Sequence, residues 1–268
     1  ASLTFGDTIN ESGTGNLTLG GPYRVTFGAT NDYSGTTLVT GGQLVLNAAG
    51  GGAINGPLDI NAGNTSGRVA NVVLAQADQI ADGVGVTVRS GGMLDLGANS
   101  ETIGTLTLQD IGIVRGSGTL TVGDLTSSSL QGGWITAPLG GGGAGQTLAK
   151  SGTGTVFLGG LNTYPGVTSV SAGTLALVGG NLGASGAGNE TNIGAAGRLL
   201  VISTNSGRET VNVDNNNGIP AGSGTGTLGK LNFTDNPTAP HVRVDAGGEL
   251  LLHNAPNSTA NIANEGAG

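Results

Sequence analysis

Short runs in which apolar and polar residues alternate recur along almost the whole chain. Residues 104–108, 118–122 and 197–201 each place two apolar side chains two positions apart after a glycine. A period of two puts every second side chain on one face of a β-strand. One face of each run therefore requires burial, and a single short run cannot bury it alone. The pattern predicts strands that stack on one another.

Internal self-similarity supports such stacking. Two stretches share the same order of polar and apolar classes, and their matching pieces are 12–21 with 151–160, 31–35 with 162–166, and 40–46 with 171–177. The first copy then carries a short insertion around residues 23–27. The closing element, a small-Gly turn followed by Leu-x-Leu, returns at 86–96 and 242–252. Spacings of about 22 to 29 residues are typical of solenoid repeats.

The predicted fold is all-β, a right-handed parallel β-helix in which Leu stacks on Leu and Val on Val. We expect one solenoid over residues 1–268, with repeat blocks at about 1–139 and 147–268 and a Gly-rich loop at 140–145 between them. About 24 residues a coil would give about eleven coils and a rod on the order of 50 Å long. An antiparallel sandwich or barrel stays open as an alternative. A local helical turn is expected only at 75–80, leading into a strand at 84–89.

Composition narrows the class of protein. The 268 residues include 55 glycines and no cysteine, with 3% aromatic and 10% charged residues. Glycine without a strict third-residue period excludes collagen, and a core of small aliphatic side chains suits narrow coils. The formal charge of −8 without a basic stripe argues against nucleic-acid binding. There is no apolar run of membrane-spanning length and no signal-peptide pattern, and the lack of cysteine suits a bacterial exported protein.

Residues 151–158, 162–166 and 170–177 resemble the passenger-associated transport repeat of bacterial autotransporters, because they run from Gly-Thr-Gly through a short apolar strand to Asn-x-Tyr-x-Gly and Gly-x-Leu-x-Leu. Residues 12–46 are similar, and 79–108 resemble the linking unit of large members. The resemblance implies a parallel β-helix carried outside the cell, as a scaffold and transport element without chemistry of its own. No outer-membrane barrel is recognisable, so we expect either a fragment or another route to the surface.

Few residues suggest chemistry. His241 and His253 flank one strand-turn-strand unit without further residues at metal-ligand spacing, and calcium nonapeptides, protease signatures and phosphate loops are missing. A polysaccharide lyase or hydrolase would need acids and a basic residue along one groove. The only conceivable set is Asp78, Asp82, Asp95, Asp110 and Asp124 with Arg89 and Arg115. We interpret these residues as solvated strand edges and turns.

Three aromatic residues could contact a ligand. Tyr33 and Tyr164 could stack on sugars, but both occupy the same repeat position, which favours a structural role in capping a turn. Trp134 is the better candidate for an exposed contact, although packing against the side of the solenoid is the stronger interpretation.

The sequence therefore predicts a non-enzymatic extracellular scaffold or adhesin segment of a bacterial surface or secreted protein, with no catalytic, cofactor-binding or metal-binding residues. End-to-end self-association into fibres is expected, because neither terminal segment, 1–10 or 254–268, contains an amphipathic helix or charged cluster to cover an open coil. A host, matrix or carbohydrate surface is a further possible partner. A carbohydrate-active β-helix and an assembly subunit remain alternatives.

Overall fold

The computed structural model describes residues 2–11, 14–63, 69–142, 145–178, 180, 182–183, 191–202, 242–244 and 249–253, the last two ranges and 201–202 as backbone only. These residues form strands and turns, and none of them lies in a helix. The strands are β1 (Ser2–Phe5), β2 (Leu17–Leu19), β3 (Arg24–Phe27), β4 (Thr37–Val39), β5 (Gly42–Leu46), β6 (Leu58–Asn61), β7 (Ala70–Leu74), β8 (Gly85–Arg89), β9 (Gly92–Asp95), β10 (Glu101–Ile103), β11 (Thr105–Leu108), β12 (Ile113–Arg115), β13 (Leu120–Val122), β14 (Ser129–Leu130), β15 (Gly133–Ile135), β16 (Leu139–Gly141), β17 (Thr147–Lys150), β18 (Thr155–Leu158), β19 (Val167–Val178), β20 (Thr191–Ile202), β21 (Val242–Val244) and β22 (Glu249–His253).

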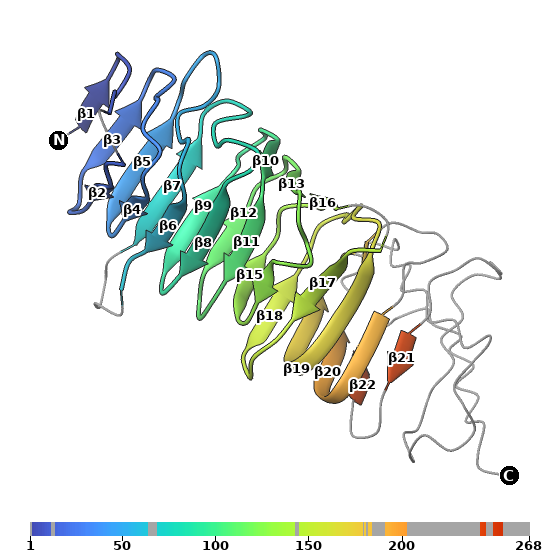
Figure 1. The fold of residues 1–268 in the computed structure, drawn as a ribbon. Helices are drawn as coiled ribbons and strands as arrows, with labels where there is room; N and C mark the ends of the chain where they lie inside the picture. The colour runs from blue at the N-terminus through green and yellow to red at the C-terminus, as the bar shows by residue number, and fades with distance from the viewer. Residues whose placement is uncertain are drawn as a thin grey trace, which may run out of the picture.

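The strands stack in parallel, each on the strand one coil earlier. One ladder runs β1–β3–β5–β7–β9–β12–β15–β18–β19, and a second runs β2–β4–β6–β8–β11–β14–β17–β19. A short third ladder joins β10, β13 and β16. Figure 1 shows the coils following one another along an elongated solenoid of about nine turns. The predicted parallel β-helix is confirmed, and the antiparallel alternative is wrong, because the paired strands are parallel throughout the described residues.

The register of pairing between successive coils explains which residues form the core. Each residue of a strand lies opposite the residue one coil earlier, so an apolar position in one coil covers an apolar position in the next. One inward column is fully buried from its third member onward and consists of Leu3, Val25, Leu44, Val72, Leu94, Val114, Ile135, Leu158 and Leu177. Stacked aliphatic columns of this kind replace the aromatic-rich core of a globular domain.

Glycine is required where the turns of successive coils touch. Gly42 and Gly173 open equivalent strand segments with φ angles of 74° and 66°. A Cβ at Gly42 would lie 2.3 Å from the carbonyl oxygen of Tyr23, and one at Gly173 would lie 2.5 Å from that of Gly152. Backbone therefore fills the space that a side chain would need, and the left-handed conformation favours glycine as well.

The structure corrects the alignment of the two long repeats. Val25 and Phe27 pair with Leu44 and Leu46 as Val156 and Leu158 pair with Leu175 and Leu177, so β3 is the counterpart of β18. Residues 23–27, predicted as an insertion, contain this strand. Segment 12–21 instead leads into β2, which lies in the ladder of β4 and β17. The error arose because a glycine turn followed by alternating apolar residues fits either strand position of a coil.

Two smaller predictions also change. Residues 75–80 form no helical turn, because β7 ends at Leu74 and Ile80 makes an isolated parallel bridge with Ile54. The Gly-rich loop expected at 140–145 is wrong for its first two residues, since Gly140 and Gly141 belong to β16 and pair with Thr121 and Val122 of β13, and residues 143–144 lie outside the described residues. Strands on both sides of this segment still stack on each other, β14 on β17 and β15 on β18. The division into two repeat blocks stays a prediction.

Candidate functional site

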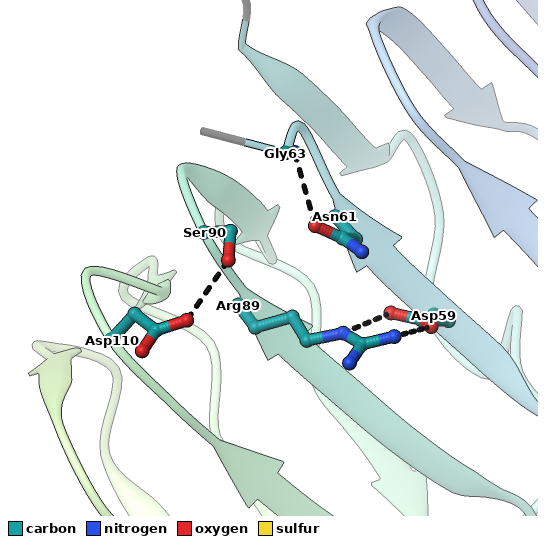
Figure 2. A network of polar contacts seen from close by, with 6 residues as sticks. All are labelled: Asp59, Asn61, Gly63, Arg89, Ser90 and Asp110. Atoms are coloured by element: carbon teal, nitrogen blue, oxygen red, sulfur yellow. Dashed lines mark hydrogen bonds and ion pairs between the residues drawn. The ribbon is translucent and has the colours of Figure 1, made fainter. Parts of the chain in front are cut away.

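A network of polar contacts lies at the outer corner of the solenoid where β6 and β8 end (Figure 2). Arg89 donates to Asp59 through one edge of its guanidinium, with Nε 3.2 Å from Oδ1 and Nη2 2.6 Å from Oδ2. Parallel pairing places Arg89 opposite Asn61, so its side chain reaches Asp59 diagonally across the ladder. The hydrogen bond to Asp59 raises the pKa of Arg89, with a smaller contribution from the charge of Asp110. This arginine is a fixed cation engaged by a carboxylate.

The neighbouring polar groups at this corner stabilise turns. Ser90 and Asp110 both have left-handed backbone conformations, with φ of 49° and 54°, and the Ser90 hydroxyl donates to Oδ2 of Asp110 at 2.9 Å. Asn61 accepts a hydrogen bond from the amide of Gly63 at 3.0 Å. Short polar side chains that bond to nearby backbone are typical of turns. The corner therefore brings Arg89 and Asp110 together, but each carboxylate already has a structural partner.

The other acidic residues of the predicted set lie elsewhere. Asp95 and Arg115, on β9 and β12, form a second ion pair of 2.7 Å, and Asp95 also accepts from the Gly97 amide. Hydrogen bonds from Ser127 lower the pKa of Asp124, which thereby caps its own turn. Asp78 is a turn residue with φ of 55°, and Asp82 is exposed.

The set thus divides between two ladders and several turns, and each of the two ion pairs joins residues of one ladder. Within the described part of the chain no three His, Cys, Asp or Glu residues gather to hold a metal ion. His241 lies outside the described residues, and His253 ends β22, where only the backbone is described.

Glu101 is a buried carboxylate that the sequence analysis missed. It is 1% exposed, and it accepts hydrogen bonds from the amides of Gln79 (2.8 Å), Ile80 (3.2 Å) and Thr102 (3.3 Å). Burial raises the pKa of Glu101 to about 7. The buried Gln79 side chain bonds in turn to both backbone groups of Ala48. Glu101 and Gln79 therefore tie three successive coils together through backbone groups.

Signals for these polar residues exist in the sequence, but they are weak. Glu101 precedes Thr102 and Ile103, so it shares the phase of the inward Ile103. An isolated polar residue in an alternating run is more often outward-facing, and only the register of the neighbouring coils decides between the two orientations.

The two repeat tyrosines are internal. Tyr164 is fully buried with its hydroxyl oxygen 2.8 Å from Oγ1 of Thr168, and Tyr33 lies 2.7 Å from Thr37 in the same way. Burial raises the pKa of Tyr33 to about 12. Neither ring is available to stack on a sugar, because both are buried and their hydroxyl partners are threonines of β4 and β19.

The asparagine of the Asn-x-Tyr motif caps the preceding coil. Oδ1 of Asn31 accepts from the amide of Ile9, and Oδ1 of Asn162 accepts from the amide of Leu139, each at 2.8 Å. Both asparagines are buried. In the first copy Nδ2 of Asn31 also donates to the carbonyl oxygen of Ala53 at 2.8 Å. The motif therefore links neighbouring coils and supplies an internal hydroxyl pair in each copy.

Trp134 combines exposure with packing. Its ring is stacked on that of Phe157, one coil further along, with centroids 3.8 Å apart and an angle of 10° between the planes, and the residue is 42% exposed. The outward column continues the apolar character on both sides with Met93, Ile113 and Ala176. Phe157 covers one face of the indole, which leaves less of it for a flat ligand.

Comparison with known families gives one match. Residues 148–177 match the model of the passenger-associated transport repeat. This range covers most of β17, all of β18 and most of β19, and it includes Tyr164 and Leu175. The resemblance predicted from the sequence is confirmed over these residues. The chain has no significant match among curated proteins or among solved structures. The described residues include no helix that is long and apolar enough to cross a membrane.

Proposed function

We propose that this chain is a non-enzymatic structural segment of a bacterial protein carried to the cell surface or secreted, where it acts as a rigid scaffold or adhesin stalk. The observation that carries the proposal is the uninterrupted parallel stacking of coils around one aliphatic core, in a chain with a passenger-associated transport repeat. Coils that contact only their neighbours extend along one axis, so length can grow without a change in cross-section.

End-to-end association of such segments is part of the proposal. Among the described strands, β1 pairs only with β3, so no described strand lies against its other edge. Leu3 is 53% exposed, whereas Leu44, in the same inward column, is fully buried. An edge of this kind is suited to accept a further parallel strand. A second copy of the chain supplies one through a head-to-tail contact.

Sedimentation velocity over a range of protein concentrations, with negative-stain microscopy, tests the association. We expect concentration-dependent growth of the species and rods longer than one molecule. Leu3→Lys places a charge in the inward column at the open edge and should abolish the growth. Thr4→Lys is the matched control, since Thr4 faces outward in the same strand, and it should associate like the wild type. A monomer at all concentrations would overturn the association and leave a passive stalk segment.

Binding to a host, matrix or carbohydrate surface is the adhesin part of the proposal, and Trp134 reports on it. It is the only tryptophan of the chain, so its fluorescence is specific to the exposed aromatic column. Titration with soluble polysaccharides should change its emission if the column contacts sugar, and Trp134→Leu should remove the binding. The carbohydrate-active alternative has less support, because three of the acids that it would need, Asp95, Asp110 and Asp124, are engaged in an ion pair, a hydrogen bond to Ser90 and a turn.

A further inference from the structure

Lys150 occupies a position that aliphatic residues hold in the other coils. It lies at the end of β17, opposite Leu130 of the preceding coil and Val170 of the next. The inward column to which it belongs also contains Val39, Ile60, Val88, Leu108 and Ile193. Lys150 is fully buried. A lysine is almost never fully buried unless its charge is paired, so its partners need an explanation.

The partners of the ammonium are backbone carbonyls. Nζ donates to the carbonyl oxygens of Ser151 at 2.8 Å, Gly152 at 2.9 Å and Ala172 at 2.9 Å. An ammonium group has three hydrogens, so all of its donors are used. Two of the oxygens belong to the turn after β17, and the third belongs to the equivalent level of the next coil. The two ion pairs found among the described residues, Arg89–Asp59 and Arg115–Asp95, do not include Lys150.

The glycine turns fit closely around the amine. Gly152 and Gly173 have φ angles of 69° and 66°, and a Cβ added to Gly173 would lie 2.8 Å from Nζ. The counterpart of Lys150 in the first repeat is Leu19, because Leu19 pairs with Val39 as Lys150 pairs with Val170. Gly21 and Gly42 adopt left-handed turns there beside leucine. The turns therefore form without an amine, and the lysine adds a contact that the first repeat lacks.

We propose that the carbonyl oxygens of Ser151, Gly152 and Ala172 form an internal cation site that takes a primary ammonium ion, supplied in the native chain by Lys150. In this site the ammonium, and not the packing of its aliphatic stem, holds the turns of two successive coils together. The competing view is that burial of the charge destabilises the folded chain. An apolar side chain of similar shape would then make the chain more stable, as has been found for other buried ions.

Lys150→Met tests whether the ammonium group stabilises the two turns, because methionine keeps an unbranched stem and loses the charge. We expect the equilibrium constant for unfolding in urea to rise about a hundredfold, since several hydrogen bonds to a charged donor are lost and their acceptors stay buried. Hydrogen exchange should accelerate at the amides of residues 151–154 and 171–175. The matched control is Leu130→Met, one coil earlier in the same column, which should change the constant by less than about tenfold. A Lys150→Met chain as stable as the wild type would overturn the proposal.

Two further measurements test the site itself. Lys150→Ala leaves the carbonyls without a cation, so methylammonium chloride should raise its Tm more than sodium or choline chloride does at equal ionic strength, whereas the wild type should show no such difference.

If neither variant folds, the wild type still decides the question. The chain has two lysines, Lys150 and Lys230. Nitrogen-15 spectra of labelled lysine at pH 6 should show one slowly exchanging ammonium group, which the Lys230→Arg variant should retain. Solvent-like exchange of both groups would overturn the proposal.

Discussion

The hydroxyl oxygens of Tyr164 and Thr168 lie 2.8 Å apart inside the solenoid, and the pair is repeated by Tyr33 and Thr37 at 2.7 Å. Thr168 is in β19, opposite Leu148 of the preceding coil, and both members of the pair are buried. A phenol in an aliphatic core is stabilised only when its hydroxyl has a partner. The Asn-x-Tyr motif and the threonine four residues after the tyrosine therefore act as one unit.

This pair predicts a stability cycle. Tyr164→Phe should lower the free energy of unfolding by about 1 to 3 kcal/mol, because the hydroxyl of Thr168 remains buried without its partner. Thr168→Val should cost a similar amount, and the double variant should cost less than the sum of the two, since neither group is then left unpaired. Urea denaturation of the four chains measures the coupling. Tyr33→Phe and Thr37→Val repeat the cycle in the first copy, and additive losses in both copies would contradict the pairing.

The inward columns predict a contrast between adjacent residues. Leu44→Ala and Leu175→Ala should each cost about 2 to 5 kcal/mol, because both leucines are fully buried and the rigid stack cannot close the cavity. Thr174→Ala should cost little, since Thr174 is only partly buried and faces away from the core. The midpoint of thermal or urea unfolding checks this difference. Equal losses at Leu175 and Thr174 would show that the register is wrong by one residue.

The contrast also shows what the sequence could predict. The inward positions of Leu44 and Leu175 follow from the sequence, because each begins a Leu-x-Leu whose alternation after a glycine turn specifies both the strand and its inward face. The repeat alignment before them failed, because β2 and β3 have the same turn-and-alternation pattern and only strand pairing separates them. The sequence pattern predicts no role for Lys150 or Glu101, for a similar reason. Each shares the phase of an inward neighbour, Leu148 or Ile103, but their partners are backbone groups whose positions no side-chain pattern encodes.

The ion pair between Arg89 and Asp59 should contribute little to stability. Its side chains are 39% and 21% exposed, so solvent screens the attraction. A double-mutant cycle with Arg89→Gln and Asp59→Asn should give a coupling energy of about 0.2 to 1 kcal/mol that decreases at high salt. Arg115→Gln and Asp95→Asn form the matched cycle at the second ion pair. A coupling well above this range, unaffected by salt, would show that the corner is more enclosed than the structure indicates.

Glu101 predicts that part of the stability depends on protonation. Burial raises the pKa of Glu101 from 4.5 to about 7, with Asp78 adding a small repulsion, so the folded chain binds this proton more tightly than the unfolded chain. The resulting stabilisation is fully present below pH 4.5 and is lost as the pH rises toward 7. The linkage between proton binding and folding puts this loss in the free energy of unfolding at roughly 3 kcal/mol for the shift of the Glu101 pKa.

Comparison with Glu101→Gln isolates this contribution, because glutamine stays neutral at every pH and keeps one acceptor oxygen for the amides of Gln79 and Ile80. The free energy of unfolding of the variant minus that of the wild type should rise between pH 5 and pH 8. Asp124→Asn is the control with the opposite sign, since hydrogen bonds from Ser127 lower the pKa of Asp124 and its contribution is lost as the pH falls. Urea unfolding at several pH values measures both differences. A difference for Glu101→Gln that does not change with pH would mean that this carboxylate is ionised in the core throughout, held by its three amide donors alone.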